Sequence, residues 1–416
     1  MSVAATATPI EAASVGRAIP PQLYAFTAAL GGATQGFITV ALGYVLASRG
    51  FPIAAIATLV ALRLLPETWR IVFGPLLDIS LNPRLWFFVA AAGSAICTLG
   101  FSLVPLQQQD MWVLEILTLA VGVFSNLTIV AQTAAIAVTA DPRVRGRIAG
   151  WSQGGNLAGL GIGGGIGLWL TSHVGLTAAA AAIALWALVC AWPMLIIRTP
   201  RPAAVLPLRV VGKELAGEVL TLASSRSGLL AILAVTLPMG LGSFLGLLSS
   251  VSSEWHASAD LTASTTGALA GLASVPGCLI GGYLCDRHPP QIVLAWTGLG
   301  CALGEAVMAL APRTPWCFVT FALLNNLLLG FAWAAVAAVI YASVKPSGGG
   351  TIGALLGSLC NLPVVIMTLV LGASAARHGV TGMMGIEATM GAMSAVVYGL
   401  AAWLWRPRAA LTAISI

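Results

Sequence analysis

Long apolar runs alternate with short polar connections along almost the whole chain. A helix needs roughly 20 apolar residues to cross the hydrocarbon core of a bilayer. Twelve runs reach that length, and we expect each to form a transmembrane helix: 22–46, 52–77, 85–106, 111–138, 148–171, 175–197, 228–251, 261–284, 291–311, 316–343, 350–376 and 380–405. The pattern therefore predicts an all-α membrane protein with twelve transmembrane helices.

The composition points to the same class of protein. Of the 416 residues, 58% are hydrophobic and 8% are charged, whereas a soluble domain is about 25% charged. The basic residues that account for the net charge of +6 lie mostly in alternate short connections; only Arg49, Arg313 and Arg377 lie in the opposite loops. Because Lys and Arg favour cytoplasmic loops, we expect both termini in the cytoplasm and an inner or plasma membrane location. The basic residues then reflect membrane topology, and we expect the lipid bilayer rather than nucleic acid as a partner. We also expect a monomer.

The same pattern divides the chain into five parts. We expect a cytoplasmic tail at 1–21, a six-helix bundle at 22–197, a cytoplasmic loop at 198–227, a second six-helix bundle at 228–405 and a tail at 406–416. The seven cysteines form no C-x-x-C motif, so neither a zinc site nor a disulfide framework is indicated. No G-x-x-x-x-G-K-[ST] motif occurs, so we expect no cofactor and no direct use of ATP.

Charged residues interrupt the second apolar run. At about 100° per residue, Arg63, Glu67, Arg70, Gly74 and Asp78 fall on one narrow helical stripe. A charge at mid-bilayer costs roughly 2.5–3.5 kcal/mol, so the stripe should face protein or a water-filled cavity. One interpretation is a structural ion network. The other is a transport site, in which an arginine binds an anionic substrate group while Glu67 carries a proton. With Glu67 ionised, one arginine lacks a partner.

The two halves of the chain repeat each other. The segment Gly74-Pro-Leu-Leu-Asp78 matches Gly282-Tyr-Leu-Cys-Asp286, 208 residues further along. A weaker match relates 145–150 to 349–354. Duplicated halves with a substrate bound between them are typical of secondary transporters.

These motifs carry a resemblance to a known family. The G-x-L-x-D-R turn at 282–287 resembles the loop motif of the major facilitator superfamily, and 74–84 resembles its counterpart in the first half. Positions 30–80 are similar to one branch, the muropeptide permeases, acetyl-CoA transporters and related siderophore permeases. The matching residues are Gly31, Gly32 and Gly36, then Gly50, Ala54 and Ile56, then Pro66, Arg70, Phe73, Pro75 and Asp78. Arg70 and Phe73 stand where that branch has Lys and Trp.

The resemblance implies two bundles that rock about a central site. It implies that Gly74, Asp78, Arg84, Gly282, Asp286 and Arg287 join cytoplasmic helix ends and control the conformational change. It also implies that spans 1, 2, 4, 5, 7, 8, 10 and 11 line the cavity. We therefore expect Gln35, Asn126, Asn325 and Asn361 to face it, although interhelical hydrogen bonds are the simpler role for buried amides. Trp69 could stack on a substrate.

Three further carboxylates lie in apolar runs. Glu305 lies about 10 Å inside the Pro312 end of its span, at 1.5 Å per residue, and is a second candidate for a proton site. Glu115 and Glu387 lie near the outer ends of their spans, where we expect them at the membrane interface.

The glycine-rich segment 154–167 contains a G-x-G-x-x-G match, but it lies inside a span and follows no strand. Small residues there allow helices to approach closely. The segment also resembles the fifth span of drug/proton antiporters, without the expected proline.

We expect a secondary transporter that takes up a small anionic or amphiphilic organic solute, driven by a proton gradient. A peptidoglycan fragment, a siderophore or an acyl thioester would fit the branch. A drug or metabolite exporter of the same fold is the alternative. A membrane-embedded enzyme or sensor is more remote, because no nucleophile or metal cluster is visible, and we expect no enzyme activity.

Overall fold

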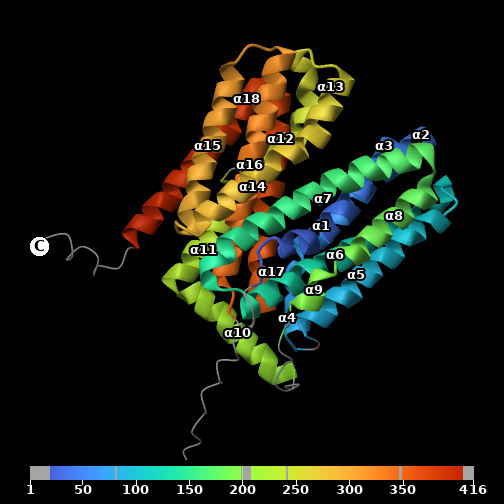
Figure 1. Ribbon diagram of the computed structural model, residues 1–416. Helices are drawn as coiled ribbons and strands as arrows, with labels where there is room; N and C mark the ends of the chain where they lie inside the picture. Colours follow the sequence, from blue (N-terminus) through green and yellow to red (C-terminus); the bar gives the residue numbers. More distant parts are fainter. Residues whose placement is uncertain are drawn as a thin grey trace, which may run out of the picture.

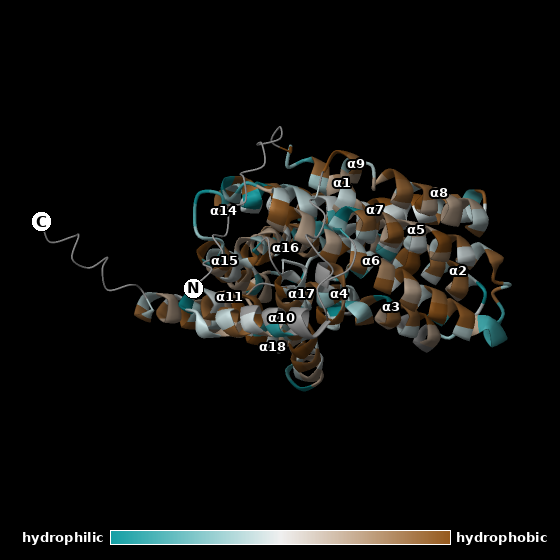
Figure 2. Cartoon of the chain, turned by 90° about the horizontal axis from the view of Figure 1, so that it is seen from below, coloured by the Kyte–Doolittle hydropathy of each residue, from teal (hydrophilic) through white to brown (hydrophobic). Residues whose placement is uncertain are grey.

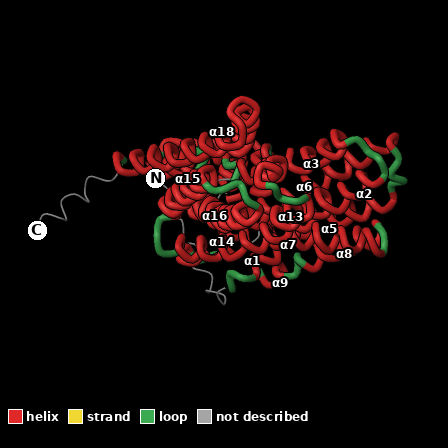
Figure 3. Tube along the Cα trace, turned by 90° about the horizontal axis from the view of Figure 1, so that it is seen from above, coloured by secondary structure: helices red, strands yellow, loops and turns green. Residues whose placement is uncertain are grey.

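The computed structural model describes residues 19–79, 82–197, 199, 208–239, 242–345 and 349–405. Within these ranges the regular structure is helical, and the helices are joined by short loops (Figure 3). The predicted all-α fold is confirmed for this part of the chain. The predicted tail at 406–416 and most of the tail at 1–21 lie outside the described residues.

The first half contains a series of long helices, several of which are interrupted. They are α1 (Leu23–Gly36), α2 (Gly43–Ser48), α3 (Ile53–Thr68), α4 (Phe73–Ile79), α5 (Pro83–Gly100), α6 (Met111–Thr139), α7 (Arg145–His173), α8 (Leu176–Val189) and α9 (Pro193–Ile196). A π-helical turn, Phe37–Leu42, joins α1 to α2 without a change of direction in the chain (Figure 1).

The second half repeats this arrangement after a connecting helix, α10 (Leu208–Ser224). Its helices are α11 (Arg226–Thr236), α12 (Ser243–Leu247), α13 (Ala259–Ser264), α14 (Ala270–Cys285), α15 (Pro290–Leu310), α16 (Pro315–Ser343), α17 (Gly349–Leu359) and α18 (Asn361–Leu404). A 3-10 helix, Leu248–Trp255, extends α12, and a π-helical turn, Thr265–Leu269, joins α13 to α14.

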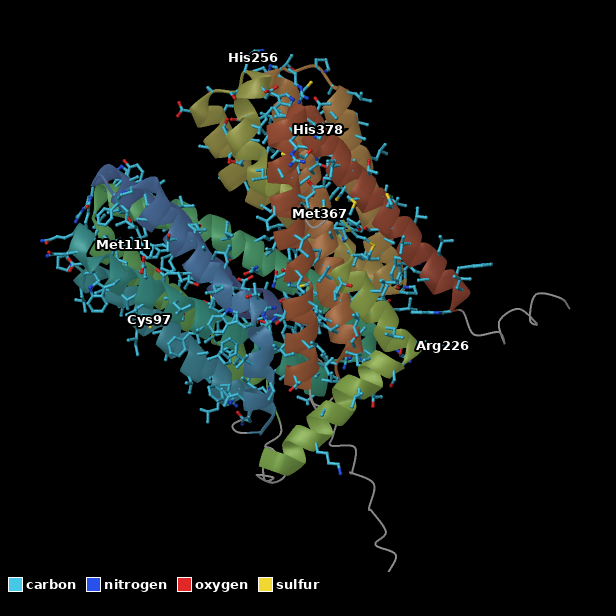
Figure 4. All side chains as sticks on the ribbon, turned by 180° about the vertical axis from the view of Figure 1, so that it is seen from behind. Cys97, Met111, Arg226, His256, Met367 and His378 are labelled. Carbon is cyan, nitrogen blue, oxygen red and sulfur yellow. The ribbon has the colours of Figure 1, made fainter. Side chains whose placement is uncertain are left out.

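The long α18 contains a reversal of the chain. Gly379 has φ 68° and ψ −172°, which is not helical. The preceding residue, His378, lies at the same end of the second half as His256, and Arg226 lies toward the opposite end (Figure 4). The helix therefore comprises two antiparallel membrane crossings.

The helices agree with the predicted crossings. Eight described segments are long and apolar enough to span a membrane. One of them, Gly349–Leu404, holds two predicted crossings on either side of Gly379. The other three predicted crossings correspond to α3 with α4, to α7, and to α11 with α12. Apolar residues dominate the outer surfaces of the helices, and polar residues gather at helix ends and connections (Figure 2).

The glycine-rich α7 packs against α1 at very short range. A Cβ atom at Gly155, Gly159 or Gly163 would collide with the backbone of Ala25, Ala29 or Ala33, respectively. The small residues recur every four positions, so they form a groove along one face of α7. Helix packing therefore accounts for these three glycines, whereas an added Cβ at Gly161 or Gly165 would meet nothing within 4 Å.

The two halves join at one end and separate toward the other. One buried apolar cluster contains residues of both halves, among them Leu77, Ala135, Val336 and Ile352. Two other clusters each lie within a single half. The helices accordingly diverge from the region of α4 and α17 toward α2 in one half and α13 in the other (Figure 1). The joined end carries the basic loops and is the predicted cytoplasmic side.

Candidate functional site at the junction of the two halves

A break in the second span divides its stripe of charges. Pro66 lacks the N–H group that a helix interior uses, and α3 ends two residues later at Thr68. Trp69 has φ −110° and ψ 26°, and a 3-10 turn, Arg70–Val72, follows before α4. Arg63 and Glu67 therefore belong to α3, whereas Arg70 belongs to the turn.

Arg63 is held inside the first half. Its side chain is only 2% exposed, and its Nη2 donates to the Gly31 carbonyl oxygen of α1 over 3.2 Å. Its Nη1 lies 3.6 Å from Oε1 of Glu67, one helical turn away. Glu67 is 22% exposed. The pair thus follows the helical spacing, with the arginine inside and the carboxylate towards the edge.

Arg70 lies between the halves. Its Nε donates to Oδ1 of Asn126 on α6 over 2.9 Å, and Nδ2 of Asn126 donates to the Gly122 carbonyl oxygen. Its guanidinium group also covers Gly357 of α17, where an added Cβ would lie 2.7 Å from Nη1. Arg70 therefore contacts both halves at once.

The second half completes this site through the junction of α17 and α18. Nδ2 of Asn361 donates to the Glu67 carbonyl oxygen over 3.3 Å and to the Gly357 carbonyl oxygen over 3.0 Å. Oγ of Ser358 accepts from the Ile71 N–H over 3.0 Å. We call Arg63, Glu67, Arg70, Asn126 and Asn361 the junction site. Each was a candidate from the sequence.

The other candidates lie outside this group. Gln35 is half-buried on α1, and Trp69 is 38% exposed beside the turn. Glu305 and Asn325 lie in the second half, on α15 and α16, and both are buried.

Glu387 is a correction to the sequence analysis. We expected it at the membrane interface, but it is only 7% exposed and lies close enough to Glu305 for the two carboxyl groups to interact. The reversal at Gly379 places Glu387 more than two helical turns inside the second part of α18. Glu115, by contrast, is partly exposed on α6.

A chain of buried polar side chains also links four helices, α1, α6, α7 and α16. Oγ1 of Thr27 donates to Oε1 of Gln132 over 2.8 Å, and Nε2 of Gln132 donates to Oγ of Ser152 over 2.7 Å. Oγ of Ser152 lies 3.3 Å from the Tyr341 hydroxyl of the second half. Gln132 thus has the simpler role of a buried amide, an interhelical hydrogen bond.

Arg145 ties the ends of two long helices together and was not a candidate from the sequence. Its Nη1 donates to the carbonyl oxygens of Tyr341 and Val344 over 2.6 and 3.2 Å, and its Nη2 donates to that of Ala137 over 3.4 Å. These carbonyls end α16 and α6, where a cation interacts favourably with the helix dipole. In the sequence, Arg145 looked only like one of several basic loop residues.

The repeated motif glycines occupy matching contacts between the halves. A Cβ at Gly74 would lie 2.9 Å from the Gly350 carbonyl oxygen of α17. A Cβ at Gly282 would lie 2.6 Å from the Gly146 carbonyl oxygen of α7. Gly146 and Gly350 occupy the same place in the weaker sequence repeat. The duplication therefore recurs as two equivalent helix contacts, α4 with α17 and α14 with α7.

The charged motif residues are less symmetric. Asp286 is paired with Arg147 of α7: Oδ2 lies 2.6 Å from Nε, and Oδ1 accepts from the Arg147 N–H over 3.1 Å. Arg84 and Arg287 instead lie over nearby aromatic rings, those of Phe88 on α5 and Tyr283 on α14. Asp78 belongs to α4, but its side chain lies outside the described part of the structure.

Comparison with known proteins places these features in a family. A family model described as Major Facilitator Superfamily matches residues 23–368. Among solved structures, the fold is similar to the proton:xylose symporter XylE bound to 6-bromo-6-deoxy-D-glucose, with a TM-score of 0.69 and 15% identity over 92% of this chain and 95% of that one. It is also similar to the human organic anion transporter MFSD10, with a TM-score of 0.65 and 15% identity over 91% and 100%. No curated protein matches the sequence.

Proposed function

The chain belongs to the major facilitator superfamily, a family of transporters rather than enzymes, and from this premise we propose that it is a proton-coupled secondary transporter of a small anionic organic solute. The two halves would expose the junction site to one side of the membrane and then to the other. The packing that joins them on the side of the basic loops corresponds to a state that is closed to the cytoplasm.

The position of Arg70 carries the proposal. Among the described residues it has no carboxylate within 4.0 Å, and its one hydrogen-bond partner is the neutral amide of Asn126. A cation inside a membrane protein is costly unless an anion or water compensates it. The planar guanidinium group binds carboxylate and phosphate groups through two parallel hydrogen bonds. An anionic group of a substrate would supply the missing charge.

Glu67 is the candidate at this site for the coupling proton. It is the carboxylate of the junction site, it is partly exposed, and its distance of 3.6 Å from Arg63 is longer than a strong charged hydrogen bond. Its backbone carbonyl accepts from Asn361 of the second half. A change in its charge would therefore act where the halves meet. The similar structures include a proton symporter and an organic anion transporter, so this fold serves both kinds of transport.

We propose uptake across an inner or plasma membrane, with both termini in the cytoplasm. The branch resemblance at positions 30–80 supports uptake, and it suggests a muropeptide, a siderophore or an acyl thioester as substrate. The glycine-rich α7 had favoured a drug exporter; the close packing of Gly155, Gly159 and Gly163 on α1 gives those three glycines a structural role.

The test is uptake into proteoliposomes under an imposed pH gradient, with a panel of labelled organic anions and neutral sugars. A hydrogen bond to a charged group contributes about 1.5–3 kcal/mol, so Arg70→Ala should weaken apparent affinity for the anion roughly 10- to 150-fold. Arg70→Lys should restore part of it. Arg143→Ala, at an exposed position on the basic side, is the matched control and should transport normally.

Two results would contradict the proposal. Wild-type kinetics in Arg70→Ala would exclude an anion site at Arg70. Accumulation that persists in the presence of an uncoupler would exclude proton coupling.

A further inference from the structure

Two buried carboxyl groups lie together in the second half, apart from the junction site. Glu305 on α15 is 4% exposed, Glu387 on α18 is 7% exposed, and the two groups interact electrostatically. Among the described residues, neither has a Lys, Arg or His side chain within 4.0 Å. The thiol of Cys301, one turn before Glu305, also interacts electrostatically with Glu305 and Glu387.

The surroundings of this pair are polar but incomplete. The backbone N–H groups of Ser243 and Phe244 lie within hydrogen-bonding reach of the Glu387 carboxylate, while its Oε2 has no partner. Asn325 is 2% exposed, and neither its Oδ1 nor its Nδ2 has a hydrogen-bond partner. Its Oδ1 lies against Gly304, the residue before Glu305, only 2.7 Å from the position of an added Cβ.

Electrostatics requires a positive charge here. Two like charges at short range in a buried site cannot both persist without compensation. An orphaned buried amide also costs about 1–3 kcal/mol. One cation near the carboxylates would relieve the charge repulsion, and Oδ1 of Asn325 is available as a neutral ligand. Hard cations favour carboxylate and amide oxygens as ligands, and a proton on one of the two carboxyl groups is the alternative form of the same compensation.

We propose that Glu305, Glu387 and Asn325 form a site for one monovalent cation, either a proton on one of the two carboxyl groups or a sodium ion. Binding at this site does not depend on the function proposed above. Its use as a coupling-ion site, in addition to the proton proposed at Glu67, rests on that function.

A series of contacts leads from this site to the junction site. Ser243, whose N–H lies near Glu387, begins α12 after Gly242, which has a positive φ of 78°. Oγ of Ser243 donates to the Val364 carbonyl oxygen over 3.4 Å. Val364 lies one turn after Asn361, which contacts the Glu67 backbone. A cation that changes how Glu387 holds the start of α12 would thus act on the helix that reaches the substrate site.

The experiment detects protonated carboxyl groups directly. Infrared spectra of the purified full-length protein are recorded near neutral pH in choline chloride and in sodium chloride of equal ionic strength. The variants are Glu305→Gln, Glu387→Gln and the double variant. Glu67→Gln and Glu115→Gln serve as controls for the other membrane carboxyl groups, and thermal unfolding confirms that each variant is folded.

In choline chloride we expect a carboxylic acid band that the double variant lacks and both controls retain. If the cation is a proton, sodium leaves this band unchanged. If it is sodium, the band declines in a saturable way as sodium replaces choline, and either single variant abolishes that response. If the double variant does not fold, the Glu305→Gln variant tests the site. We expect it to lose the band, because the backbone N–H groups of Ser243 and Phe244 stabilise the ionised form of the remaining Glu387.

A wild-type spectrum without such a band in choline, or a band that survives both single substitutions, would overturn the proposal. The experiment uses no substrate. It can therefore fail while the transport assay succeeds, or succeed while that assay fails, and the two proposals remain separable.

Discussion

Gly282→Ala should push the protein out of the state that is closed at the basic end. Gly282 of α14 packs on α7, and an added Cβ would lie 2.6 Å from the Gly146 carbonyl oxygen and 2.7 Å from the Gly150 Cα. All of these neighbours are backbone atoms, so no side chain can rotate away. The helices would have to separate by about 1 Å to reach ordinary contact distance.

The expected magnitude follows from the cost of overpacking. Inserting a methyl group into a tightly packed contact costs about 1–3 kcal/mol. The penalty applies to the closed state alone, because the contact lies between the halves and is lost when they separate. The equilibrium between the two states should therefore shift roughly 5- to 150-fold toward the open form. Gly271→Ala on the same helix is the matched control, since its nearest neighbour, the Leu157 carbonyl oxygen, is 3.7 Å away.

The assay is the distance between spin labels at Arg143→Cys and His288→Cys, on opposite halves at the basic end, in a background without the native cysteines. Both positions are exposed. Gly282→Ala should enlarge the population at long distance, and Gly271→Ala should not. An unchanged distance distribution in Gly282→Ala would refute the assignment of this contact as a gate.

Two further predictions concern polar contacts between helices. Asp286→Asn should open the basic end more than Arg147→Gln. Asp286 is 10% exposed and also accepts a backbone N–H, whereas Arg147 is 49% exposed and its ion pair contributes less than about 1 kcal/mol. The same spin-label distances measure both variants, and equal effects would contradict the assignment. Gln132→Leu removes the partner of buried Thr27 and Ser152 and should destabilise the fold by about 1–3 kcal/mol, seen as a lower Tm with no change in label distance.

The sequence predicted long helices closely and helix breaks poorly. Uninterrupted apolar runs with Pro or charged ends placed α6 and α16 within a residue of their observed bounds, because burial in a bilayer imposes length directly. The π-helical turns and the break between α11 and α12 are not visible in periodicity. Neither feature changes the spacing of apolar residues, although the break contains Pro238, which lacks a helical N–H.

The junction site was predictable where helical spacing or charge determined it. The four-residue spacing of Arg63 and Glu67 indicated their pairing, and the rarity of membrane charges singled out Arg70. The contact of Arg70 with Gly357 could not be predicted, since glycine gives no chemical signal. Glu387 was misplaced although its depth in its span resembles that of Glu305. Counting 1.5 Å per residue from the end of the span, which selected Glu305, would have selected Glu387 too.

The two halves share their packing but not their charges. Gly74 and Gly282 make equivalent contacts with α17 and α7, so duplication explains how the halves close. By contrast, the buried Arg63 and the partly exposed Arg70 belong to the first half, and the buried Glu305–Glu387 pair lies in the second. The two equivalent contacts, α4 with α17 and α14 with α7, can form and break in one motion. An anion site and a cation site, by contrast, need side chains of opposite charge. If both proposals hold, the division of charge between the halves would let a symmetric scaffold bind an anion beside the arginines of the first half and a cation in the second half.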